Sequence, residues 1–89
     1  MTAAELAALG LRVKPLEFGS DPVAFSPFGN MYQLCRAHGE YWVIFTKRLA
    51  RRGECEVIEG QNRTEAEAIA ACNDHNAAQV AAMLERIEE

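Results

Sequence analysis

Two Cys-x-x-His pairs are the residues whose types and spacing could hold a metal ion. Cys35 and His38 form the first pair, and Cys72 and His75 form the second. Two sulfurs and two imidazole nitrogens suit the tetrahedral coordination of zinc. Structural zinc sites usually take two cysteines from one knuckle, so this arrangement is unusual and we expect no metal site. The alternative is a buried Cys35, a half-buried Cys72 and two surface histidines.

A cluster of basic residues could instead bind an anion. Lys47, Arg48, Arg51 and Arg52 lie within six positions, and arginine can grip a phosphate or carboxylate with two hydrogen bonds. The formal net charge of the chain is −4, however, which weighs against nucleic-acid binding because that needs a positive surface. The alternative is a solvated loop, or a loop that meets the acidic C-terminal segment of a neighbouring subunit.

Catalysis has little support in the sequence. Cys72 and His75, with Asp74 between them, could form a thiol–imidazole pair. A nucleophilic thiol needs electropositive surroundings, and this segment is acidic. The chain carries no glycine-rich phosphate-binding motif. An enzyme-sized pocket is also hard to fit in so short a chain. We therefore predict that the protein is not an enzyme and needs no cofactor.

Length and composition predict one domain, residues 1–89. Hydrophobic residues make up 49% of the chain and charged residues 25%, as in ordinary globular proteins. Three cysteines without close pairing do not form a disulfide framework. The sequence has no apolar run of the roughly 20 residues that span a bilayer, and its start lacks the features of a secretion signal. We expect a cytoplasmic protein that does not associate with membranes.

The expected elements are a short helix, a β-meander and a long helix. Thr2 and Thr64 each stand three residues before a glutamate, which predicts two capping boxes. The first helix should end at Gly10, and the second should run from Thr64 to Glu89. Residues 23–26, 31–36, 41–46 and 54–59 read as strands, and 11–18 as an edge strand or an irregular approach. Short connections favour an antiparallel meander of three to five strands with the helix packed on it, an α+β fold.

The sheet and the helix both carry more apolar surface than one short chain can cover. In the strand 41–46, alternate residues on both faces are apolar, and one helix covers only one face. The other face needs the N-terminal segment, the 11–22 region or a second copy. The helix stripe expected to face the sheet consists of Ala66, Ile69, Ala70, Ala77, Val80, Ala81 and Leu84. A helix of about 24 residues would also overhang so small a domain. These features predict a twofold homodimer, and the alternative is a monomer with a frayed tail.

The order of motifs resembles that of small phage and prophage proteins of alphaproteobacteria. The chain has Pro27-Phe28-Gly29-Asn30-Met31-Tyr32 after an aromatic residue, then a Tyr-Trp strand, then a helix that begins at Thr64-Glu-Ala-Glu-Ala. The likeness covers about residues 16–87, and it implies a phage-related origin without a known activity. The order of elements is also similar to that of double-stranded RNA-binding domains. Their second helix opens with lysines, however, whereas this one opens with Glu65 and Glu67, which would repel the RNA backbone.

We therefore predict a non-enzymatic protein-interaction module that associates with itself and binds a phage or host protein. The alternative function is nucleic-acid or anion binding through the basic loop 47–52.

Overall fold

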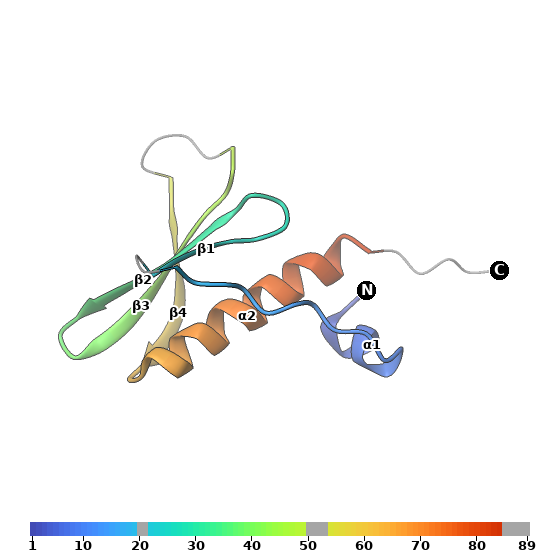
Figure 1. Ribbon diagram of the computed structural model, residues 1–89, viewed down its shortest axis with the longest axis horizontal. Coiled ribbons are helices and arrows are strands. Elements are labelled where there is room, and N and C mark those ends of the chain that lie inside the picture. The colour runs from blue at the N-terminus through green and yellow to red at the C-terminus, as the bar shows by residue number, and fades with distance from the viewer. Residues whose placement is uncertain (20–21, 50–53, 85–89) are drawn as a thin grey trace.

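The computed structural model describes residues 1–19, 22–49 and 54–84. Along the chain the elements are α1 (Ala3–Ala8), β1 (Val23–Phe25), β2 (Met31–Ala37), β3 (Glu40–Thr46), β4 (Glu56–Asn62) and α2 (Glu65–Ala82). The strands form one antiparallel sheet in the order β1-β2-β3-β4, and α2 packs across one face (Figure 1). The predicted α+β meander with a C-terminal helix on the sheet is confirmed.

The β2–β3 hairpin is the centre of the sheet. Its strands pair from Met31 opposite Thr46 to Ala37 opposite Glu40. The turn between them places His38 and Gly39 in the left-handed region, with φ of 54° and 75°. Such a turn matches the right-handed twist of the two strands, so it fixes which residues face each other.

The hydrophobic core lies between this hairpin and α2. Alternation along the strands puts one set of side chains beneath the helix, and these pack against the helix residues Ala68 and Cys72. The strand residues of the core are Tyr32, Leu34, Val43 and Phe45. Leu16, Phe18, Tyr41, Ile58 and Ile69 close the margin of this core.

The N-terminus of α2 is capped as the sequence predicts. The Thr64 hydroxyl accepts a hydrogen bond from the Glu67 backbone N–H at 3.2 Å. The Glu67 carboxylate accepts from the Arg63 backbone N–H at 3.2 Å, one residue before the cap. Together they satisfy donors that would otherwise lack partners at a helix start. The helix ends at Ala82, earlier than predicted, and residues 85–89 lie outside the described residues.

Residues 11–18 follow the irregular course, which is one of the two alternatives that the sequence predicts. They run along α2, where the Leu16 N–H donates to the Asn73 side chain at 2.8 Å (Figure 1). Two other features differ from the sequence prediction. Strand β4 begins at Glu56 and continues through Asn62, so residues 60–62 extend the sheet rather than lead into the helix. The predicted helix stripe is largely wrong, because α2 buries Ala68, Cys72 and Asn76, with Ala81 alone shared with the stripe.

Helix α1 packs on the C-terminal half of α2 (Figure 1). Leu6 is buried there with 4% of its surface exposed, and the Met1 ammonium donates to the Leu84 carbonyl at 3.0 Å. The N-terminal segment therefore supports the overhanging end of the long helix.

Candidate functional site

The face of the sheet that α2 does not cover is the largest candidate site, and we call it the open face. Its residues alternate with the core residues and form cross-strand rows that the pairing register defines. One row is Val23, Gln33, Ile44 and Val57; a second is Phe25, Met31 and Thr46; a third is Cys35 and Trp42. None of these nine residues is charged, and seven are apolar. A fourth row at the hairpin turn, Ala37 and Glu40, lies on the same face and adds one carboxylate at its end.

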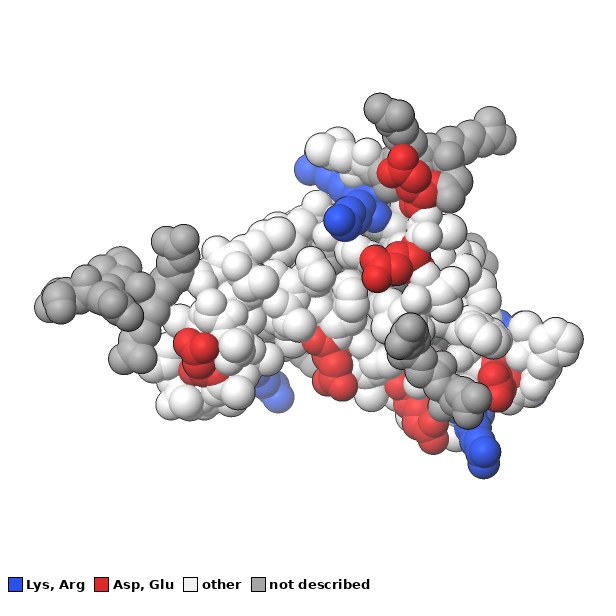
Figure 2. Space-filling model, turned by 180° about the vertical axis from the view of Figure 1, so that it is seen from behind, with Lys and Arg blue, Asp and Glu red and all other residues white. Residues whose placement is uncertain are grey.

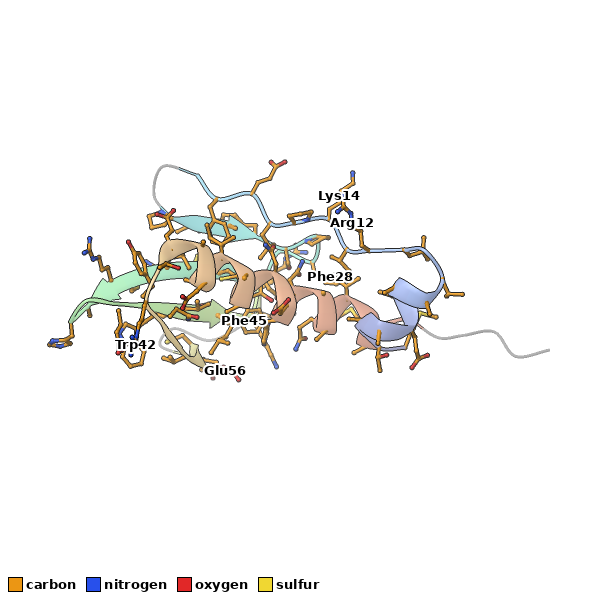
Figure 3. The ribbon with its side chains drawn as sticks, turned by 90° about the horizontal axis from the view of Figure 1, so that it is seen from below. Arg12, Lys14, Phe28, Trp42, Phe45 and Glu56 are labelled. Atoms are coloured by element: carbon orange, nitrogen blue, oxygen red, sulfur yellow. The ribbon has the colours of Figure 1, made fainter. Side chains whose placement is uncertain are left out.

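Several of these side chains are strongly exposed. Phe25 has 66% of its surface exposed, Val57 49% and Trp42 42%. Helix α2 packs on the opposite face and α1 packs on α2, so no helix of the described chain covers the open face (Figures 1 and 3). In Figure 3, Phe45 lies behind α2, whereas Trp42, three residues earlier on the same strand, points away from it.

The size of the open face sets it apart from scattered surface hydrophobics. Four strands about 4.8 Å apart, with up to seven residues that rise about 3.3 Å each, cover about 400 Å² in flat projection. The largest apolar patch on a typical monomeric protein covers about 300–600 Å² and is often functional, so a largely apolar face of this size fits an interaction site.

A polar contact lies beneath α2, on the covered side of the sheet. The Tyr32 hydroxyl is 2.7 Å from Nδ1 of His75. The His75 ring also packs on Phe45, with 4.7 Å between the ring centroids. Sequence reasoning placed His75 on the surface, which is wrong. Its position three residues after Cys72 was the available signal, because residues so spaced share a helix face.

Burial dominates the chemistry of the two titratable groups in this region. Removal from water raises the pKa of the Cys72 thiol to about 11. Burial, with a smaller contribution from the Cys72 charge, raises the pKa of Tyr32 to about 12. Both groups are therefore neutral near pH 7, and a buried thiol of high pKa is a poor nucleophile.

The structure separates the two Cys-x-x-His pairs. Cys35 lies on the open face and Cys72 in the core on the other side of the sheet, while His38 is exposed in the hairpin turn. Among the described residues, which include all four, no group of three or more metal-ligating side chains is close enough to hold an ion. The two pairs do not combine into one zinc site. The expected burial also differs, because Cys35 is half-buried and Cys72 fully buried.

The basic cluster is only partly described. Lys47 and Arg48 are exposed just after β3, while Arg51 and Arg52 lie outside the described residues. Lys47 lines a hollow together with two acidic residues, Glu54 and Glu56. Figure 2 shows basic and acidic side chains next to one another at this end of the molecule. This mixture lowers the positive potential that an anion or nucleic acid requires.

Comparison of the chain with family models, curated proteins and solved structures found no match. The resemblance to phage proteins therefore stays a prediction. Within the described residues, no helix combines the length and the apolar character that crossing a bilayer requires.

Proposed function

We propose that this protein is a non-enzymatic protein-interaction module and that the open face of its sheet is the docking surface. The observation that carries the proposal is the uncovered set of apolar side chains on β1–β4, in which Phe25 has 66% of its surface exposed and Trp42, two rows away, has 42%. Each Å² of apolar surface that a partner covers stabilises the complex by about 25 cal/mol. Summed over the open face, this is a large free energy for so small a domain.

The chemistry of the face favours a protein as its ligand. Nucleic acid and anionic lipid both require cations, and the four rows of the open face include none. A small molecule requires a concave site that surrounds it, whereas one face of a sheet is broad. Another apolar protein surface can cover it by side-chain interdigitation at core-like density.

The cellular setting is part of the same proposal. Free thiols at Cys35, Cys55 and Cys72 are typical of the reducing cytoplasm, where we propose that the module acts. A partner of phage or host origin is what the sequence resemblance implies, and it stays a prediction.

Site-specific photo-crosslinking in cells that express the chain tests the proposal. Three variants each carry one photoreactive phenylalanine analogue. Two have it on the open face, in place of Phe25 or Val57, and the third has it in place of Met83. Met83 is a matched control because it is 60% exposed but lies just after α2, away from the sheet. We expect position 25 and position 57 to form adducts with one protein that mass spectrometry identifies, and position 83 not to form them.

A second variant separates docking from chance collision. The variant with the probe at position 25 is given the additional substitution Val57→Lys, which places a charge on the open face. We expect this charge to abolish the adduct at position 25. Equal adducts at all three positions, or none at positions 25 and 57, would contradict the proposed function.

A further inference from the structure

We propose that the occupant of the open face is a second copy of this chain, packed sheet on sheet about a twofold axis. This inference rests on the proposed function and names the partner at the same surface. The axis lies in the interface, parallel to the strands and between β2 and β3. It places β1 over the partner's β4, and β2 over the partner's β3, with the two sheets about 10 Å apart.

The side chains of the open face are complementary to themselves in this arrangement. Cys35 and Trp42 are cross-strand neighbours on β2 and β3. The axis sets Trp42 over the partner's Cys35, so the largest side chain meets one of the smallest, twice. Met31 and Thr46 form a second such pair of neighbours, and Met31 meets the partner's Thr46 in the same way. Large residues over small ones are what interdigitating layers need to pack at native density.

The outer strands continue this match. Val23 on β1 and Val57 on β4 belong to the same row, so each lies over the other in the partner. In the middle of that row, Ile44 meets the partner's Gln33 near the axis. The three rows bring no charged residue to the interface, and the one carboxylate of the row at the hairpin turn, Glu40, lies over the partner's Ala37 at the end of the interface. A chain with a net charge of −4 can therefore meet its copy through this surface.

The area is sufficient for a specific dimer. Two open faces cover about 800 Å² in flat projection. Protruding side chains, with Phe25 and Trp42 the largest, make the accessible area greater than its projection. The buried total is then on the order of 1,000 Å², the lower bound for a specific interface.

The single tryptophan of the chain makes the inference directly testable, because Trp42 lies on the open face. Sedimentation equilibrium from micromolar to submillimolar protein gives the mass, and acrylamide quenching of Trp42 over the same range gives its accessibility. We expect a dimer in which quenching of Trp42 falls as the mass rises. Val57→Lys should raise the dimer Kd by about 30-fold or more, the size typical of a disrupted interface core.

Two further variants test the geometry. Cys35→Phe fills the space assigned to the partner's Trp42, and we expect it to weaken the dimer while the circular dichroism of the diluted monomer is unchanged. Met83→Lys makes the same apolar-to-lysine change as Val57→Lys outside the open face, and we expect no effect on Kd. If Cys35→Phe unfolds the monomer, the smaller change Cys35→Leu serves the same purpose.

Three results would overturn the inference. The first is a monomer at every concentration. The second is a dimer whose Trp42 stays fully accessible, as pairing through the β4 edge would give. The third is a dimer weakened equally by Met83→Lys. If one of these results is obtained but positions 25 and 57 crosslink to a different protein, the homodimer inference fails and the proposed function is retained. If neither position forms an adduct, both the inference and the proposed function are wrong.

Discussion

The hydroxyl of Tyr32 on β2 lies 2.7 Å from Nδ1 of His75 on α2, and this contact joins the sheet to the helix. The Tyr32 ring also meets the His75 ring edge to face, with centroids 5.6 Å apart. Burial holds the pKa of Tyr32 near 12, so the contact joins a neutral phenol to Nδ1 of the imidazole, and the tautomer of His75 sets which of the two donates. The bond fixes which side of an alanine-rich helix faces the sheet, a choice that hydrophobicity alone leaves open.

Removal of the Tyr32 hydroxyl should destabilise the fold. Tyr32→Phe keeps the ring but leaves Nδ1 of the half-buried His75 without its hydrogen-bond partner, and we expect the free energy of unfolding to fall by about 1–3 kcal/mol. Urea unfolding measures this loss. Tyr41→Phe is the matched control, since Tyr41 is half-buried beside the same core. Equal losses in the two variants would show that the Tyr32–His75 bond contributes nothing specific.

Alkaline pH should destabilise the protein through the same region. Burial raises the pKa of Cys72 from 9.0 to about 11 and that of Tyr32 from 10.0 to about 12. The unfolded chain therefore loses these protons first, so their contribution is complete below pH 9 and is lost as pH rises through 11 and 12. Each group accounts for at most about 3 kcal/mol.

Thermal unfolding between pH 8 and pH 12 measures this effect. We expect Tm to fall from about pH 9 upward. In Cys72→Ala the decline should begin about one pH unit later, because only the Tyr32 contribution remains. A Tm that is constant to pH 11 in the parent chain would contradict the prediction.

The two helix caps should differ in their effect on stability. Thr64→Ala removes the hydroxyl that accepts from the Glu67 N–H, and we expect a loss of about 1 kcal/mol of global stability. Thr2→Ala removes the equivalent bond from the Glu5 N–H at 3.1 Å. Thr2, however, caps a helix of only six residues, which packs on α2. We expect local fraying instead, seen as faster amide exchange in α1 with an unchanged urea midpoint. A larger global loss from Thr2→Ala would reverse this ranking.

The fold could be predicted from the sequence because its local signals agree. The aromatic and β-branched run Tyr41–Thr46, the turn at His38-Gly39 and the Thr64 capping box each specify one element, and short connections leave only an antiparallel meander. The boundary of β4 could not be predicted. Glycine and asparagine at its end usually mark a turn, and here pairing of Asn62 with Tyr41 across a register shift overrides that preference.

The buried face of α2 could not be predicted for a related reason. Apolar residues occur all round this helix, so a stripe through Ile69 and Val80 was as plausible as any other. The structure instead turns three polar residues, Asn73, His75 and Asn76, toward the protein. Two of them gain specific partners, the Leu16 N–H and the Tyr32 hydroxyl. Those partners lie more than forty residues away in the chain, and the periodicity of a single helix carries no information about such distant contacts.

The open face was predictable as an excess of apolar surface but not as a single site. The sequence showed that both sides of the 41–46 strand are apolar. It could not show that residues 11–19 leave the open face uncovered, because that depends on where an irregular segment packs. The structure places Leu16 and Phe18 against the core on the helix side, which leaves Trp42 and Val57 exposed.

The basic loop provides the test between the two function classes. A module that docks through a largely apolar sheet face should elute from heparin at low salt, because Lys47 shares its hollow with Glu54 and Glu56 and the chain as a whole is acidic. Joint replacement of Lys47, Arg48, Arg51 and Arg52 by glutamine should leave both this elution and the Trp42 quenching unchanged. Retention that requires high salt, and that the fourfold variant abolishes, would favour anion or nucleic-acid binding. The salt dependence then gives the number of phosphate contacts, since each contributes about 0.9 to the slope of log K against log salt on duplex DNA.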